Sequence, residues 1–117
     1  MNHIQRATLN SARGLFGAIT SETAVRIELA LLLPAIPLGI VLAPSAGWYV
    51  AMIGVLLATL AVELLNTAIE KLADHVTPEH HPAIGLVKDV GSAAVLCMLA
   101  LAGLIWAAAV ALRAGWL

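Results

Sequence analysis

The feature that most constrains this chain is a stretch of 34 consecutive residues without a charged side chain, from Leu29 to Val62. The segment APSAGW, residues 43–48, divides it, because proline, serine and glycine together mark a turn. Removing about five turn residues leaves about 29 for two helices, or about 43 Å, whereas two crossings of a core about 30 Å thick need about 60 Å. Both helices must therefore extend past the charged ends of the run, which brings Glu28 and Glu63 to the hydrocarbon edge.

The composition places the chain among membrane proteins. Of its 117 residues 62% are hydrophobic and 11% are charged, whereas a soluble domain has about 25% charged residues. This length leaves room for one domain of a few membrane-spanning helices. The net charge of −1 and the lack of a basic run give no indication of nucleic-acid binding. Cys97 is the only cysteine, which excludes an internal disulfide.

We expect an all-α membrane protein in which the whole chain forms a single domain. Three spans are predicted, at about residues 25–43, 48–69 and 90–112. Residues 2–21 mix apolar positions with two arginines, which is typical of an amphipathic helix lying on the membrane surface. Between the second and third spans we expect a polar loop, from about Lys71 to Asp89.

The distribution of basic residues predicts the orientation in the membrane. Four of them fall on one side of the three-span layout and one on the other: Arg6, Arg13, Lys71 and Lys88 against Arg113. The positive-inside rule therefore places the N-terminus and the polar loop in the cytoplasm and the C-terminus outside. Trp48 and Trp116 then lie at the outer interface, where aromatic residues are enriched.

Polar residues at helical spacing follow the second apolar run. Glu63, Asn66, Glu70 and Asp74 lie at i, i+3, i+7 and i+11, which is one stripe of an α-helix. Carboxylates inside a membrane are rare and usually face protein or water. Glu63 lies seven residues before Glu70, so it is about 10 Å deeper in the membrane along the helix axis, at 1.5 Å per residue. At that depth a water-soluble reagent can meet the polar end of a lipid.

Further charged residues reach the same membrane border, namely Glu22, Glu28, Lys88 and Asp89. One or two carboxylates together with substrate phosphates usually hold Mg²⁺, and lysine is a flexible point charge for phosphate. This set of carboxylates and a lysine suits phosphoryl transfer to a lipid, in which a partly desolvated carboxylate accepts the proton of the lipid hydroxyl.

Spacing alone leaves other interpretations open. Glu63 also suits a proton-relay residue in a small carrier or a polar anchor between helices. Lys88 and Asp89 also suit an interfacial lysine and a helix cap. The histidines lack zinc spacing and are expected to be solvated loop residues, namely His75, His80 and His81. No GxxxxGK[ST] motif is present, so a P-loop is not indicated.

Two motifs carry a resemblance to a known family. ELLNTAIEKLADH, beginning at Glu63, and KDVGSAAVL, beginning at Lys88, are similar to the bacterial diacylglycerol kinase family of small membrane kinases, which includes undecaprenol kinases. The likeness runs from about residue 11 to residue 100. It implies a surface helix, three spans and a homotrimer in the inner membrane, with active sites between subunits. It also implies that MgATP phosphorylates a lipid hydroxyl.

The resemblance implies roles for individual residues. Glu63 occupies the position of the general base, and Asn66 is the polar residue beside it. Glu22 and Glu70 match the two carboxylates that hold the metal bridging ATP.

The second motif implies nucleotide contacts. Lys88 and Asp89 match the pair that contacts the phosphates and their surroundings. Leu86 stands where family members often carry a basic residue, and the N-terminal helix is less basic than usual, so the strength of nucleotide binding stays open. KDVGSAAV favours diacylglycerol as the lipid substrate, and undecaprenol is the alternative.

Overall fold

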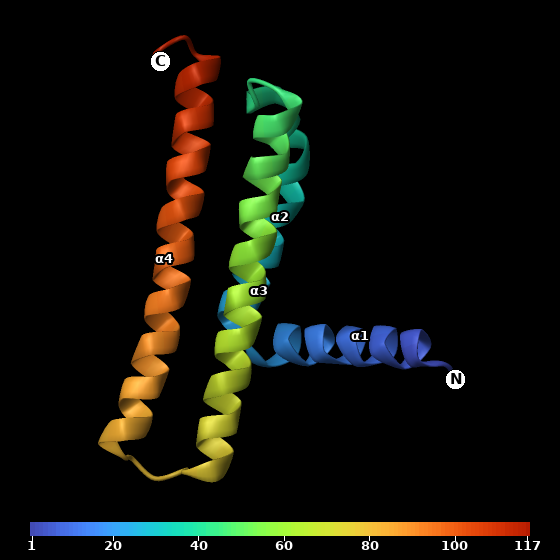
Figure 1. Ribbon diagram of the computed structural model, residues 1–117, viewed down its shortest axis with the longest axis vertical. Helices are drawn as coiled ribbons and strands as arrows, with labels where there is room; N and C mark the ends of the chain where they lie inside the picture. The colour runs from blue at the N-terminus through green and yellow to red at the C-terminus, as the bar shows by residue number, and fades with distance from the viewer.

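The computed structural model describes all 117 residues and consists of four α-helices and short connections (Figure 1). Their bounds are α1 His3–Ser21, α2 Thr23–Leu42, α3 Ala46–Val76 and α4 Pro82–Arg113. The last three run side by side, with α3 packed against both α2 and α4, which hardly touch each other. α1 projects sideways from this bundle, and the C-terminus lies at the end opposite to the α3–α4 connection (Figure 1).

Local capping chemistry determines where the helices begin. Asn2 and Gln5 form a capping box at α1, with Asn2 Oδ1 accepting from the Gln5 backbone N–H at 2.8 Å. The predicted turn after the first span is confirmed, and Ser45 caps α3 there. At α4, His81 Nδ1 accepts from the Ala83 N–H at 3.1 Å, and Pro82 occupies the first helical turn.

The predicted polar loop from Lys71 to Asp89 is wrong in its extent. α3 continues to Val76 and α4 begins at Pro82, so only Thr77 to His81 is non-helical. No glycine or proline interrupts residues 71–76, and a proline is readily accommodated at a helix start. Charged residues marked the expected edge of the membrane, but they do not end a helix. α3 and α4, of 31 and 32 residues, are therefore about 46 and 48 Å long at 1.5 Å per residue, well beyond a core of about 30 Å.

Contacts between the helices fix the register of the bundle. The Trp106 indole N–H of α4 donates to the Met52 carbonyl of α3 at 3.0 Å. On the other flank α2 comes close to α3 at Gly39, where an added Cβ would lie 3.1 Å from the Tyr49 ring. Pro34 and Pro37 lie inside α2, which continues through both of them.

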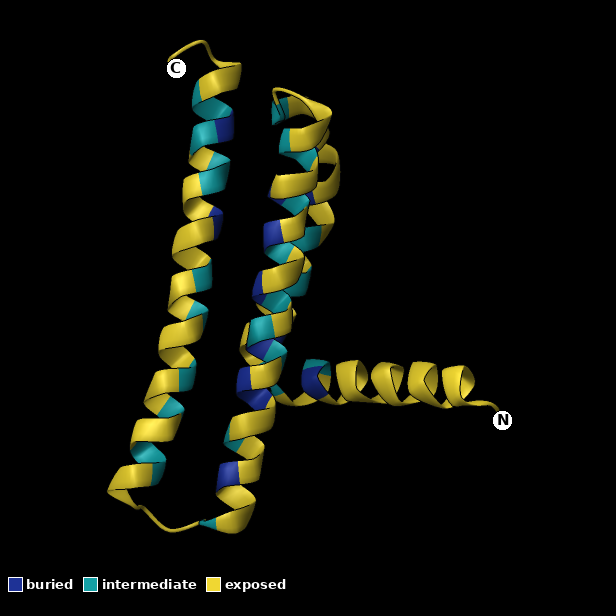
Figure 2. Cartoon of the chain, in the orientation of Figure 1, coloured by how far each residue is buried: buried dark blue, intermediate teal, exposed yellow.

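Most residues of the bundle are exposed (Figure 2), and many of the exposed residues are large and apolar. Only 13 of the 117 residues are buried, and large residues such as Leu31, Leu96 and Leu104 are more than 60% exposed. An apolar surface of this extent is unstable in water and stable in lipid or against other chains. α2, α3 and α4 are each long and apolar enough to span a membrane. The expected all-helical architecture with three candidate spans is therefore confirmed.

Candidate active site

The residues Glu63, Asn66, Glu70 and Asp74, here called the acidic stripe, lie along one face of α3. Glu63 and Asn66 are each only 7% exposed, and Glu70 is half-buried. The Asn66 side-chain N–H donates to Glu70 Oε1 at 3.2 Å, an i, i+4 contact that requires an unbroken helix. Glu63 makes no side-chain hydrogen bond to the rest of the chain. The buried carboxylate of Glu63 therefore lies two turns along α3 from the carboxylate of Glu70, which Asn66 holds in place.

α2 brings more negative charge to this face. Glu63 is within electrostatic range of Glu22 and Glu70, and Glu28 is within range of Glu63. One oxygen of Glu28 is buried and has no hydrogen-bond partner. Lys71 Nζ lies 3.4 Å from Glu22 and balances part of this charge. Four carboxylates, two from α3, one from α2 and one from Glu22 just before α2, thus share one region with a single nearby lysine, an arrangement that favours binding a cation.

α4 contributes less directly than the sequence suggested. Lys88 forms an ion pair with Asp74 of α3, rather than with Glu70, and both side chains are partly exposed. Asp89 is exposed. Lys88 is thus paired with Asp74, the last residue of the acidic stripe, and the side chain of Asp89 is accessible from solution.

A magnesium ion is implied by the kinase resemblance, and the side chains present fit one. No group of three or more His, Cys, Asp or Glu residues converges as a protein-only metal cage. Mg²⁺ usually takes only one or two protein carboxylates and completes its shell with water and substrate phosphates. Glu22 and Glu70 supply oxygen donors of this kind, and both are partly exposed.

The histidines take no part in such a cluster. His80 and His81 are exposed in the connection between α3 and α4, as expected. His75 was expected in a loop and instead lies in the last turn of α3, because that helix is longer than predicted.

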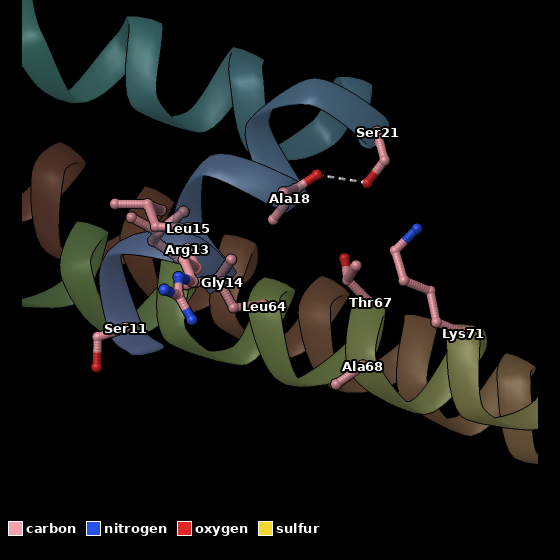
Figure 3. A pocket seen from close by; sticks show the side chains of 12 residues that line it. Ser11, Arg13, Gly14, Leu15, Ala18, Ser21, Leu64, Thr67, Ala68 and Lys71 are labelled. Atoms are coloured by element: carbon pink, nitrogen blue, oxygen red, sulfur yellow. Dashed lines mark hydrogen bonds between the residues drawn. The ribbon is translucent and has the colours of Figure 1, made fainter. Parts of the chain in front are cut away.

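A groove of about 840 Å³ lies between α1 and α3 (Figure 3). Small residues of α1, namely Gly14, Gly17 and Ala18, form one wall, and the other wall includes Leu64 and Thr67 of α3. Leu64 and Thr67 directly follow Glu63 and Asn66 in the chain, so the groove lies about 100° around the axis of α3 from these two residues, and Glu63 does not line it.

Comparison with known proteins identifies the family. Residues 9–110 match the family model of prokaryotic diacylglycerol kinase. The chain belongs to the prokaryotic diacylglycerol kinase family. The resemblance read from the two motifs is thus confirmed, and the matched region contains all six predicted site residues, from Glu22 to Asp89.

Several curated proteins resemble this family member over nearly their full length, and each is named diacylglycerol kinase. That of Haemophilus influenzae is 37% identical over 106 residues, covering 91% of this chain and 90% of the relative. That of Pseudomonas aeruginosa is 39% identical over 107 residues, with 92% and 87% covered. That of Escherichia coli K12 is 36% identical over 103 residues, with 88% and 84% covered.

Sequence reasoning missed three features of the site in this diacylglycerol kinase family member. It brought Glu28 to the membrane border but did not assign it to the site beside Glu63. It also did not pair Lys71 with Glu22 or Lys88 with Asp74. The position of Glu28 was signalled by the shortness of the uncharged run, whereas the ion pairs depend on how the helices are packed.

Proposed function

We propose that this protein transfers the γ-phosphoryl group of MgATP to the free hydroxyl of diacylglycerol and so forms phosphatidate. The observation that carries the proposal is the state of Glu63, a carboxylate 7% exposed that has no hydrogen-bond partner in its own chain. Such a group is available to accept a proton from a substrate. The names of the relatives supply the lipid, because each is called a diacylglycerol kinase.

The transfer needs one base and stabilisation of charge. The lipid hydroxyl oxygen forms a bond to the γ-phosphorus, the bond from that phosphorus to the bridging oxygen of ADP breaks, and the hydroxyl proton passes to Glu63. A positioned general base typically contributes about 10²–10⁴-fold to the rate. Glu63 is deep enough in α3 to meet the hydroxyl of a lipid whose acyl chains remain in the hydrocarbon.

The phosphate end of the reaction lies nearer to water. Glu22 and Glu70 would hold Mg²⁺, which on binding neutralises charge on the transferred phosphoryl group. Asn66 fixes the position of Glu70 through the hydrogen bond already described. Lys88 has three N–H donors, so it can contact a phosphate oxygen while it remains paired with Asp74. Asp89, exposed on α4, would contact the surroundings of the nucleotide phosphates.

The assembly and orientation follow from the resemblance. We propose a homotrimer in the bacterial inner membrane, with α1 lying on the cytoplasmic surface, the active sites at the cytoplasmic face and the C-terminus outside. The extensive exposed apolar surface supports contacts between spans of different subunits. An incomplete set of metal ligands in one chain is compatible with a site that is completed by nucleotide or by a second subunit.

The test is phosphorylation by purified protein in mixed micelles with radiolabelled ATP. Diacylglycerol and undecaprenol are offered in parallel, with Mg²⁺ present or chelated. We expect magnesium-dependent phosphatidate and little undecaprenyl phosphate. Preferential phosphorylation of undecaprenol would change the assigned substrate. The absence of both products from folded protein would contradict the proposal and favour a proton-coupled carrier.

A further inference from the structure

Gly91 of α4 lies directly against the side chain of Asn66 of α3. A Cβ atom added at Gly91 would collide with the Asn66 amide oxygen and lie 3.2 Å from Asn66 Cγ. Gly103, in the same helix, has nothing within 4 Å of the corresponding position. The space occupied by the Asn66 amide therefore exists only because residue 91 has no side chain.

The Asn66 amide is held between two partners with opposite requirements. Its N–H donates to the Glu70 carboxylate, and its oxygen is buried with no conventional donor nearby. A flipped amide would direct its oxygen at the negative carboxylate, so Glu70 determines the orientation. The oxygen then faces the Cα–H of Gly91, a weak donor that recurs where helices approach closely.

We propose that Gly91 is a positioning residue of the active site. It leaves room for the Asn66 amide between α3 and α4, and Asn66 in turn orients Glu70. This inference rests on the proposed function, in which Glu70 holds magnesium beside the γ-phosphate. Gly91 touches neither substrate nor metal and acts only through Asn66.

A methyl group at position 91 would force one of two changes. Either the Asn66 side chain rotates away from α4, or α4 moves away from α3. The first change breaks the hydrogen bond to Glu70, and the second exposes the amide to water that competes for it. In both cases Glu70 loses its fixed orientation. Loss of a partner that orients a metal ligand typically lowers metal affinity or activity about 10–100-fold.

The chain offers a direct spectroscopic test, because it contains only three asparagines, Asn2, Asn10 and Asn66. Protein labelled with ¹⁵N-asparagine in micelles gives few side-chain amide signals, and the Asn66→Ala variant assigns the relevant pair. We expect Gly91→Ala to shift the Asn66 amide signal in the same direction as Glu70→Ala, since the first displaces the donor and the second deletes the acceptor of that hydrogen bond. Gly103→Ala is the matched control and should leave the signal in place. An unchanged Asn66 signal in Gly91→Ala would overturn the inference.

Kinetic measurements then distinguish a positioning role of Gly91 from a nonspecific loss of activity. We expect Gly91→Ala to lower kcat and raise the Mg²⁺ concentration for half-maximal rate about tenfold or more, with KM for the lipid nearly unchanged. In an Asn66→Ala background the same substitution should change kcat less than about twofold, because coupled residues are non-additive. Additive effects in this double-mutant cycle would show that Gly91 does not act through Asn66.

The folding of the variants provides a second test of the contact between Gly91 and Asn66. If Gly91→Ala alone does not fold, combining it with Asn66→Ala should restore folding, because the collision is removed. Failure of both variants to fold would contradict the inference. Absence of lipid phosphorylation by the parent protein, with the amide response intact, would instead overturn the proposed function and leave the Gly91–Asn66–Glu70 contact established.

Discussion

At the scale of single residues, two carboxylates stand out because the chain leaves them unsatisfied. Glu63 is buried without a hydrogen bond, and Glu28 has one buried oxygen without a partner. A carboxylate at the centre of a membrane helix costs about 2.5–3.5 kcal/mol on insertion scales, and less at the hydrocarbon edge, where Glu28 and Glu63 are expected. Placing two such groups close together adds mutual repulsion, which a purely structural anchor would avoid. Their arrangement is better explained by a cation or a substrate proton that arrives with the ligands.

Glu70→Gln tests the proposed metal ligand. The amide keeps the size of the side chain but loses the negative charge that attracts Mg²⁺. We expect the free Mg²⁺ concentration for half-maximal rate to rise about tenfold or more at saturating ATP. The measurement is the initial rate of phosphatidate formation as a function of free Mg²⁺. An unchanged magnesium dependence would remove Glu70 from the metal site.

The stripe itself could be predicted from the sequence, because 3.6-residue periodicity is a local property of the helix. Spacing was sufficient to place Glu63, Asn66 and Glu70 on one face. It was insufficient for the Asn66–Gly91 contact, which depends on how deeply two helices approach each other. Small residues at the start of the third span, from Gly91 to Ala94, indicate in the sequence that another helix can approach closely there, but no rule of spacing links residue 91 to residue 66.

At the scale of elements, the α3–α4 pair extends well past the expected spans. The extension carries Lys71, Asp74 and Lys88 on rigid helix rather than on a flexible loop. The prediction of a polar loop failed because charge marks where a helix leaves the membrane, whereas a helix ends at a breaker or a cap. The residues that mark the start of α4 are Pro82, in its first turn, and His81, its N-cap. The register between Asp74 and Lys88 then follows from a connection of only five residues, 77–81.

Two substitutions separate the roles of the Lys88–Asp74 pair. Lys88→Met removes a proposed phosphate contact, so we expect KM for ATP to rise about tenfold, which corresponds to about 1.4 kcal/mol. Asp74→Asn breaks the same ion pair but leaves the lysine charge, so KM for ATP should change much less. Because both side chains are partly exposed, each variant should lose at most about 1 kcal/mol of stability.

Thermal unfolding in micelles checks the stability of both variants, and steady-state kinetics with varied ATP checks the affinity. Equal increases in KM for the two variants would mean that the pair matters only as a structural link between α3 and α4.

At the scale of the whole molecule, the chain is a bundle in which most residues are exposed (Figure 2), and many of these exposed residues are large and apolar. Composition and the lengths of the uncharged runs were sufficient to predict three candidate spans, because membrane thickness imposes helix length directly. Assembly could not be predicted in this way. It depends on which exposed faces are complementary, and apolar residues facing lipid look the same as those facing another subunit.

The proposed orientation can be tested with single cysteines. In a Cys97→Ala background, a cysteine replaces either His80, in the α3–α4 connection, or Leu117, at the C-terminus. With a membrane-impermeant maleimide on intact spheroplasts, we expect the position-117 variant to be labelled and the position-80 variant to be labelled only after permeabilisation. The reverse pattern would place the candidate site on the outer face, away from cytoplasmic ATP.

The central claim is that Glu63 accepts the lipid proton during phosphoryl transfer. Thr59 provides a matched control, because it is buried one turn deeper on the same face and its hydroxyl already donates to the Val55 carbonyl at 2.7 Å. The deciding measurement is the initial rate of phosphatidate formation from diacylglycerol and MgATP by Glu63→Gln and Thr59→Val in mixed micelles. We predict a loss of at least about 100-fold for Glu63→Gln and less than about twofold for Thr59→Val. A folded Glu63→Gln protein that keeps the parental rate would contradict the account.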